Sequence, residues 1–213
     1  YFDRDYDYEK YLENQGKLDR MSSLIEVCKQ VNFYYARQSK MLGNGHALLQ
    51  AKEFIGDEPF AFADGDSIID TDTPVVGQTL KAFEQTGANI IGASRLEDKE
   101  EMTKYGNIYA SKTDQDRVYK VEQMAEKPEI ENTSEQGLIV AGMRYIFTDE
   151  IWQFLETQGK GKDGEIWVSD AADRMLNSED SELYAYEYEG EYFDTGTPES
   201  MFKAEKNLQS DIR

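Results

Sequence analysis

Helical and strand-like segments alternate between residues 46 and 96, and this order constrains the fold more than any other feature of the sequence. The helical pattern HALLQAKEFI is followed by the strand-like run PFAFADGD. A second helical pattern, PVVGQTLKAFEQTG, ends at Gly87 and is followed by ANIIGASRL. This last run is short and almost wholly apolar, which is typical of a strand buried on both faces of a parallel sheet. We therefore predict an α/β fold with a doubly wound, mostly parallel mixed sheet.

The pattern of segments changes near residue 100. The earlier part opens with two helical patterns and the strand-like run VNFYYARQ at 31–38. The later part contains, in order, the strands YGNIYAS, RVYKVEQMAE and GLIVAGMRYIF, the helices TDEIWQFLETQG and EIWVSDAADRML, the strand ELYAYEYEGEYF and the helix TPESMFKAEKNLQ. No internal repeat or low-complexity linker separates the parts. We expect a core at 1–100 and a lobe at 101–213, packed as one unit.

The charge of the chain limits its partners. It has 43 acidic and 23 basic residues, a formal net charge of −20, which argues against a nucleic-acid or anionic-membrane surface. An anionic substrate must then be bound by local groups, namely backbone amides, a few Lys or Arg side chains, and metal ions. The one cysteine, Cys28, excludes an internal disulfide framework and a Cys-based zinc site. A lone cysteine and the lack of an apolar run of about 18 residues lead us to expect a cytoplasmic protein without a spanning helix.

Acidic residues follow two of the strand-like runs. Asp64 and Asp66 come after the apolar run in ADGD, and Asp194 follows a strand in YFDTGTPES. Ligands of α/β sheets lie beyond the carboxyl ends of the strands, and Mg²⁺ takes one or two protein carboxylates there. The alternatives are a plain polar turn for the first pair and a helix cap for Asp194. The two sites matter for chemistry only if they converge on one metal.

Two further motifs are weak when taken alone. GNGHA places glycines at a helix N-terminus, where amide groups can approach a phosphate or a carbonyl, but such a motif is usually only a tight turn. AEKPE places Glu126 beside Lys127 at a strand end. Adjacent side chains of a strand point to opposite faces, so we do not expect these two to form a simple ion pair. The alternative is a solvated charged turn.

The order and the residues of the motifs resemble one family over essentially the whole chain. In chain order they are Gln38 with LGNGHA, then GDEPFAFADGD, YGNI, AEKPE, MRYIFTDEIW, GEIWVSDAA and YFDTGTPESM. The motifs closely resemble those of the UTP–glucose-1-phosphate uridylyltransferases. These are bacterial-type members of the sugar-nucleotidyltransferase superfamily. The resemblance implies a Rossmann-like nucleotide-diphospho-sugar transferase fold. Residues 1–100 would be the remainder of the nucleotide-binding core, and 101–213 the sugar-binding lobe with the closing strand and helices.

The resemblance also implies roles on the nucleotide side of the site. Gln38 would read the uracil edge, since its amide offers both a donor and an acceptor. Gly43 would leave room for the base and bond it through its backbone. Asp66 would bind Mg²⁺ as a catalytic residue, and Asp194 would be the second metal ligand.

On the sugar side, the resemblance implies that Gly106 presents its backbone to the sugar and that Glu126 accepts hydrogen bonds from glucose hydroxyls. Lys127 would contact the phosphates as a catalytic residue. Gly142 and Asp170 would belong to the sugar pocket.

The implied reaction joins UTP and glucose 1-phosphate to give UDP-glucose and pyrophosphate, with Mg²⁺ and without a covalent enzyme intermediate. One alternative within this chemistry is a thymidylyl, cytidylyl or guanylyl transferase. Another, from a different class, is a non-catalytic sugar-nucleotide-binding protein. The family also leads us to expect a homo-oligomer.

Three departures from the family pattern affect these expectations. The family's N-terminal Gly-rich loop, with its Gly-Thr-Arg and a downstream Pro-Lys, is absent from this sequence, and the first strand of the sheet goes with it. We therefore expect the sheet to lack its first strand and this chain by itself to be inactive or nearly so. Gly142 is followed by Met143 where the family commonly has Gly next to the Arg, and Trp167 stands where the family usually has Gln.

Overall fold

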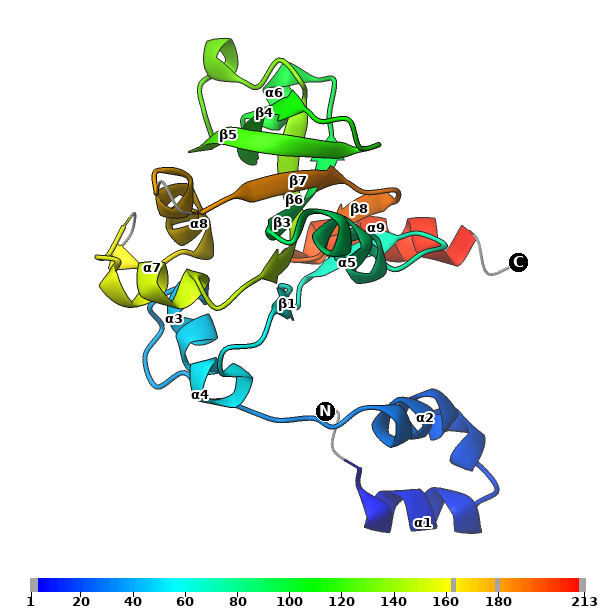
Figure 1. Cartoon of the computed structure of the whole chain (residues 1–213). Helices are drawn as coiled ribbons and strands as arrows, with labels where there is room; N and C mark the ends of the chain where they lie inside the picture. Colours follow the sequence, from blue (N-terminus) through cyan, green and yellow to red (C-terminus); the bar gives the residue numbers. More distant parts are fainter. Residues whose placement is uncertain (1–3, 162–163, 179–180, 211–213) are drawn as a thin grey trace. The chain divides into compact units, whose positions relative to one another are not determined.

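The fold is known from a computed structural model that describes residues 4–161, 164–178 and 181–210. The chain divides into two compact units, Tyr1–Ser39 and Lys40–Arg213 (Figure 1). The division lies at Ser39, whereas the boundary near residue 100 stays a prediction. Strands from both sides of residue 100 share one sheet, because β3 (Asn89–Arg95) pairs with β6 (Leu138–Phe147).

The first unit is helical. It contains α1 (Tyr6–Asn14), η1 (Leu18–Met21) and α2 (Ser22–Gln30). Asp5 caps α1, with its carboxylate accepting a hydrogen bond from the backbone of the third residue into the helix. The strand predicted at 31–38 is wrong, since this segment forms neither helix nor strand. Aromatic and β-branched side chains favour a strand only where a ladder of hydrogen bonds holds it, and every described strand pairing lies between residues 60 and 194.

The second unit carries the remaining helices and strands. They are α3 (Asn44–Leu49), α4 (Lys52–Ile55), β1 (Phe60–Phe62), β2 (Ser67–Asp70), α5 (Val75–Thr86), β3, α6 (Lys99–Met102), β4 (Gly106–Lys112), β5 (Val118–Glu126), η2 (Ile130–Asn132), β6, α7 (Ile151–Thr157), α8 (Val168–Leu176), β7 (Leu183–Glu187), β8 (Glu191–Asp194) and α9 (Pro198–Ser210). As predicted, α5 ends at Gly87, which adopts the left-handed conformation (φ 69°) that glycine tolerates best. The single helix predicted at 46–55 is two short helices, α3 and α4.

The main sheet has six strands in the order β1-β6-β3-β7-β5-β4, and β2 pairs with β8 in a separate two-stranded sheet. The α/β fold with a mixed sheet is confirmed. The expected predominance of parallel pairing is wrong, because β3–β7 is the only parallel pair among the described residues. An apolar strand shows burial on both faces, not the direction of its neighbours. In this sheet the long strand β6 runs antiparallel to both β1 and β3.

The run ELYAYEYEGEYF, predicted as one strand, is divided between the two sheets. Its first half is β7 and its second half is β8. Gly190 lies between them with φ 144°, a conformation that L side chains rarely adopt. This break carries the chain from the main sheet to the small sheet, where β8 ends at Asp194.

Helices cover both faces of the main sheet (Figure 1). Ile90 and Ile91 are adjacent on β3 and fully buried, yet they belong to different hydrophobic clusters. Ile90 shares a cluster with Ala82 of α5, and Ile91 shares one with Ile151 of α7 and Val168 of α8. Adjacent residues of a strand point to opposite faces, so this division shows the doubly wound arrangement that the sequence predicts.

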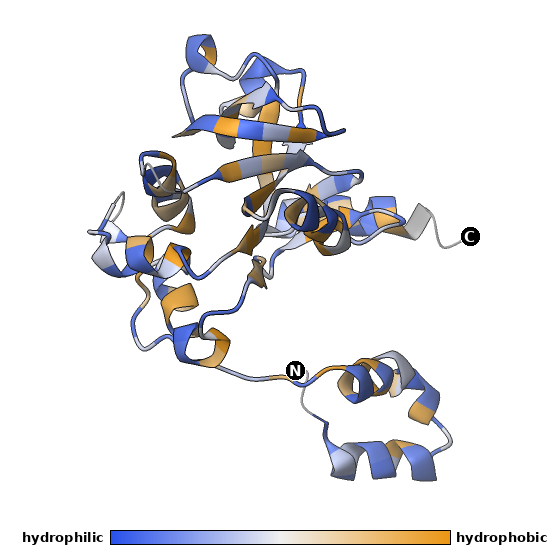
Figure 2. Cartoon of the chain, in the orientation of Figure 1, coloured by the Kyte–Doolittle hydropathy of each residue, from blue (hydrophilic) through white to orange (hydrophobic). Residues whose placement is uncertain are grey.

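The burial pattern of the strands reflects their place in the sheet. β3 is buried at five consecutive residues, whereas β5 alternates between hydrophobic and hydrophilic segments over part of its length (Figure 2). In the parts of the chain that the structure describes, no helix is long and apolar enough to cross a membrane.

Candidate functional site

A cavity of about 410 Å³ lies in the second unit, where β4, β5, β6 and β8 meet the loop after β1 and the start of α8. Seven of the nine site residues predicted from the sequence line it, namely Asp66, Gly106, Glu126, Lys127, Gly142, Asp170 and Asp194. These residues are spread over about 130 positions of the chain. The fold therefore brings together residues whose motifs were each weak when taken alone.

The carboxylates of Asp66 and Asp194 both lie beside Gly196. A Cβ atom added to Gly196 would lie 3.1 Å from Asp194 Oδ1 and 3.5 Å from Asp66 Oδ2. The backbone holds this arrangement, because the Thr195 amide and hydroxyl both donate to the Asp66 carbonyl, at 3.0 Å and 2.7 Å. Within the described ranges no group of three or more His, Cys, Asp or Glu residues could hold a metal ion. The site therefore offers a pair of carboxylates, which is within the number that Mg²⁺ takes from a protein.

Asp64, the other acid of ADGD, has a different role. It accepts a hydrogen bond from Arg144 Nη1 at 2.9 Å and one from Ser67 Oγ at 2.8 Å. The sequence motif places both acids at the end of a strand but gives no signal that distinguishes them. The structure does, since Asp64 is engaged by Arg144 while Asp66 lies beside Asp194.

Gly106 and Glu126 face each other as partners in the β4–β5 ladder. A Cβ atom on Gly106 would lie 3.1 Å from Glu126 Oε2, which is closer than side-chain carbons normally approach. The missing side chain at Gly106 therefore gives the Glu126 carboxylate its place in the cavity.

Lys127 does form an ion pair with Glu126, contrary to the expectation from strand geometry. Lys127 Nζ lies 3.7 Å from Glu126 Oε1, and both side chains are about half exposed. The pair forms because Lys127 leaves the extended conformation, with φ 46°. Lys127 is one of three non-glycine residues with positive φ among those described, and such strain often marks functional sites.

A second non-glycine residue of this kind, Met143, lies in the same cavity. Gly142 and Met143 have φ values of 71° and 35°, so β6 is distorted where it passes the cavity. A Cβ atom on Gly142 would lie 3.2 Å from Ile69 and 3.3 Å from the Tyr192 ring. The backbone at Gly142 thus packs closely against both strands of the small sheet.

Asp173, which sequence reasoning missed, lines the cavity together with Asp170 from α8. Burial raises the pKa of both carboxyls, and the charge of Asp173 raises the pKa of Asp170 further. Their i, i+3 spacing on a predicted helix was the available signal, because it places both on one helix face. Trp167, adjacent to this helix, also lines the cavity.

Three tyrosines contribute to the wall. Tyr105 and Tyr192 meet edge to face with ring centroids 6.2 Å apart, and burial raises the pKa of each. Tyr145 is 1% exposed, and its hydroxyl has no hydrogen-bond partner among the described residues. Burial raises its pKa, with smaller contributions from the charges of Glu126 and Asp64, so this phenol stays neutral.

Gln38 and Gly43 are not among the residues that line the cavity. Gln38 belongs to the Tyr1–Ser39 unit, whereas the cavity belongs to the other unit, so the role of Gln38 stays a prediction. Gly43 precedes α3 with φ 91°, and a Cβ atom there would lie 2.5 Å from the Ile166 carbonyl. Close packing of this turn against Ile166 is therefore sufficient reason for a glycine at this position.

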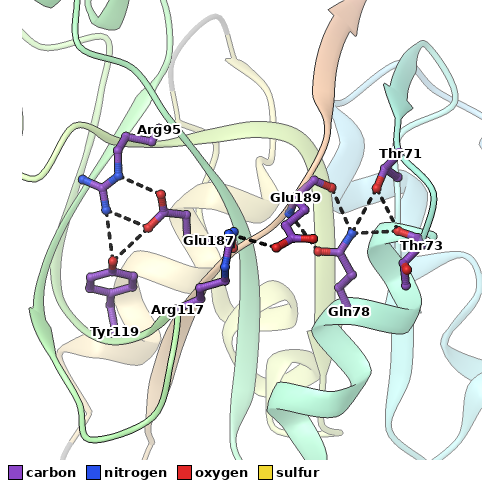
Figure 3. Close-up of polar contacts among 8 residues, drawn as sticks. All are labelled: Thr71, Thr73, Gln78, Arg95, Arg117, Tyr119, Glu187 and Glu189. Carbon is purple, nitrogen blue, oxygen red and sulfur yellow. Dashed lines mark hydrogen bonds and ion pairs between the residues drawn. The ribbon is translucent and has the colours of Figure 1, made fainter.

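A buried amide holds the turn that leads into β8 (Figure 3). Gln78 of α5 is 5% exposed and donates to the carbonyls of Thr73 at 2.7 Å and Glu189 at 2.9 Å. It also accepts a hydrogen bond from the Glu189 amide at 2.8 Å. Gln78 thus fixes the turn before β8, whose last residue is Asp194.

A separate group in the same view ties three strands of the main sheet together (Figure 3). Arg95 of β3 donates two hydrogen bonds of 2.7 Å to Glu187 of β7 and one of 3.0 Å to the Tyr119 hydroxyl of β5. None of these three residues lines the cavity.

Comparison with known proteins places the chain in a family. The chain matches the family model described as nucleotidyl transferase over residues 5–211. A UTP–glucose-1-phosphate uridylyltransferase of Staphylococcus epidermidis is 39% identical over 196 residues, and UTP–glucose-1-phosphate uridylyltransferase 2 of Staphylococcus saprophyticus is 38% identical. Each alignment covers 92% of this chain and 66% of the relative, so the chain spans just under two thirds of the length of these curated relatives.

Solved structures show the same fold. A UDP-glucose pyrophosphorylase complexed with UDP-glucose superposes with a TM-score of 0.83 at 30% identity, covering 100% of this chain and 76% of that chain. An apo-UDP-glucose pyrophosphorylase superposes with a TM-score of 0.89 at 29% identity and the same coverage. These comparisons confirm the resemblance drawn from the sequence motifs.

Proposed function

Because the chain belongs to the nucleotidyl transferase family, we propose that it carries the metal, sugar and phosphate sites of a UTP–glucose-1-phosphate uridylyltransferase. Such an enzyme transfers the uridylyl group of UTP to glucose 1-phosphate and releases pyrophosphate. The observation that carries this proposal is the cavity, since one space gathers carboxylates, two lysines and glycine backbone from six segments of the chain. UDP-glucose, the product, is also the ligand of the solved pyrophosphorylase complex that this chain resembles.

A divalent cation fits the convergent pair of carboxylates. Asp66 and Asp194 would supply one oxygen each, and the phosphates of the substrate would supply further ligands, as is usual for Mg²⁺. Bound Mg²⁺ would neutralise charge on the phosphates and hold them in line. The two aspartates contribute the fixed, negatively charged surface that selects and orients the cation.

Glu126 and Lys127 suit the two halves of a sugar phosphate. The Glu126 carboxylate accepts hydrogen bonds only, which matches the hydroxyl donors of glucose. The Lys127 ammonium attracts phosphate oxygens, and the strained backbone at Lys127 directs the chain out of β5 at the cavity. We assign the sugar hydroxyls to Glu126 with the Gly106 backbone, and the phosphates to Lys127.

Gly142 and Asp170 complete the proposed sugar pocket. Gly142 lets β6 approach the small sheet closely, and Asp170 lines the same cavity from the start of α8. We propose recognition of uracil for Gln38 and Gly43, which rests on the motifs alone.

The proposed chemistry is a direct displacement. An oxygen of glucose 1-phosphate attacks the α-phosphorus of UTP, the bond from that phosphorus to the bridging oxygen of the β-phosphate breaks, and pyrophosphate leaves with the electron pair. No side chain changes its covalent state, so the site acts by positioning and by neutralising charge. The expectations of a homo-oligomer and a cytoplasmic location stay predictions.

Isothermal titration of the chain with UDP-glucose, with and without Mg²⁺, tests the proposal. We expect binding that strengthens with Mg²⁺ and loses this dependence in an Asp66→Asn variant. Asp72→Asn is the matched control, because Asp72 is an exposed aspartate outside the cavity. Binding of a different nucleoside diphosphate glucose in preference to UDP-glucose would contradict the uridylyl assignment. No binding of any of them would contradict the proposed site.

A further inference from the structure

Arg144 of β6 makes three hydrogen bonds from one guanidinium group. Its side chain is 14% exposed. It donates from Nη1 to Asp64 Oδ1 at 2.9 Å and to the Gly142 carbonyl, and from Nη2 to the Ser67 carbonyl at 2.9 Å. Arg144 does not itself line the cavity, so it is not a candidate for substrate contact.

These contacts hold both ends of the segment 64–67. Arg144 binds Asp64 at one end and Ser67 at the other, and the Ser67 hydroxyl closes the segment by donating to Asp64 Oδ2 at 2.8 Å. Asp66 lies inside this closed segment. Ser67 is also the ladder partner of Asp194 in the β2–β8 pair. One arginine thus supports the backbone beside both carboxylates of the proposed metal site.

Arg144 also forms an ion pair with Asp64, the acid two residues before Asp66. An ion pair whose members are 14% and 24% exposed is held firmly, and Asp64 would otherwise stand as a third negative charge beside Asp66. Because the guanidinium engages Asp64, this carboxylate is held by a side chain, whereas Asp194 Oδ1 accepts a backbone hydrogen bond from the Gly196 amide at 2.8 Å.

We propose that Arg144 is a positioning residue, which holds the segment 64–67 so that the Asp66 and Asp194 carboxylates converge on a divalent cation. This inference rests on the proposed function, because it concerns the same metal site. A planar guanidinium can serve three acceptors spread over two segments, whereas the single ammonium of a lysine is a point charge on a flexible stem. The geometry therefore requires arginine, and a positive charge alone does not replace it.

The test compares Arg144→Lys and Arg144→Met with the wild-type chain. Mn²⁺ binding is measured in the presence of UDP-glucose from the electron paramagnetic resonance signal of free Mn²⁺. We expect the affinity for Mn²⁺ to fall on the order of tenfold in both variants, since loss of groups that orient metal ligands costs about 10- to 100-fold. A similar fall in both variants indicates geometry, and recovery in the lysine variant would indicate charge alone.

Arg95→Lys is the matched control for general destabilisation. Arg95 also joins a carboxylate, Glu187, to other acceptors, but it lies outside the cavity. We expect this variant to lose folding stability while it keeps the wild-type affinity for Mn²⁺. If the Arg144 variants do not fold, Ser67→Ala removes one bond of the closed segment and should weaken Mn²⁺ binding by a smaller factor.

The outcomes separate this inference from the proposed function. If the folded Arg144→Lys chain, or Ser67→Ala where the Arg144 variants do not fold, binds Mn²⁺ as the wild type does, the role of Arg144 is overturned and the proposed function stands. If the wild-type chain binds UDP-glucose but no Mn²⁺, the metal site and the role of Arg144 are both overturned. If Arg95→Lys loses as much Mn²⁺ affinity as the Arg144 variants, general destabilisation explains the loss in all of them, and the inference is overturned.

Discussion

Replacement of Gln78 by alanine removes the buried amide that holds the turn before β8. The side chain is 5% exposed and belongs to α5. The backbone hydrogen bonds of this helix do not involve the side chain. Alanine is a good helix former, so the variant leaves the helix intact and acts only on the hydrogen bonds of the amide. Those bonds join α5 to Thr73 and Glu189.

The expected loss of stability follows from the number of well-formed hydrogen bonds that the substitution removes. Three of them have good lengths, 2.7, 2.9 and 2.8 Å, while a fourth contact, to Thr71 Oγ1 at 3.4 Å, is too long to count fully. Each hydrogen bond contributes about 1 kcal/mol net, so we expect the free energy of unfolding to fall by about 3 kcal/mol. The fall will be smaller where water reaches the carbonyls that are left behind.

Urea denaturation followed by tryptophan fluorescence measures this change. Trp152 and Trp167 both belong to the Lys40–Arg213 unit, so the signal reports on the unit that contains Gln78. Gln85→Ala is the matched control, because Gln85 lies exposed on the same helix and its loss should change stability by less than about 0.5 kcal/mol. A loss below about 1 kcal/mol in Gln78→Ala would refute the view that this amide anchors the turn.

Three further changes test the cavity and the sheet. Gly106→Ala places a Cβ 3.1 Å from Glu126 Oε2. The half-exposed Glu126 carboxylate can move aside, so the free energy of unfolding should change by less than about 1 kcal/mol. The displaced carboxylate should raise the dissociation constant of UDP-glucose by about tenfold, and an unchanged dissociation constant would contradict this. Tyr145→Phe removes a buried hydroxyl without a described partner and should leave the stability unchanged or raise it by up to about 1 kcal/mol in urea denaturation, whereas a clear loss would reveal a partner. Arg95 lowers the pKa of Glu187 below its ordinary 4.5 through their hydrogen bonds, so this contribution to stability is present above pH 4.5 and is lost as the pH falls through the folded-state pKa. The difference in unfolding free energy between wild type and Glu187→Gln should therefore shrink on acidification, and a constant difference would argue against the pair.

Local chemistry made parts of this fold predictable. The end of α5 at Gly87 follows from a glycine that adopts a left-handed conformation, a preference that needs no knowledge of the rest of the chain. The position of Asp64, Asp66 and Asp194 was predictable for a similar reason, because polar residues directly after apolar strands lie at the edge of a sheet. Their convergence was not predictable from spacing, and the family resemblance supplied it.

Other features depend on partners that are distant in the sequence. The segment 31–38 has the composition of a strand, but a strand exists only through its ladder. The direction of β6 cannot be read from its apolar residues, because burial on both faces is the same for either direction. The ion pair of Glu126 and Lys127 depends on the positive φ of Lys127. A lysine gives no sequence signal for a positive φ.

The acidity of the cavity opposes phosphate binding, and in the proposed function local groups offset this charge. Six acids line the space against two lysines. These acids are Asp64, Asp66, Glu126, Asp170, Asp173 and Asp194. Arg144 pairs with the first, and burial raises the pKa of the two on α8. A divalent cation on Asp66 and Asp194 would offset the charge of that pair, and Glu126 would face the uncharged sugar. The phosphates would then meet Lys127 and the cation rather than the net charge of the chain, so a salt-dependent, metal-dependent affinity is the expected behaviour of this site.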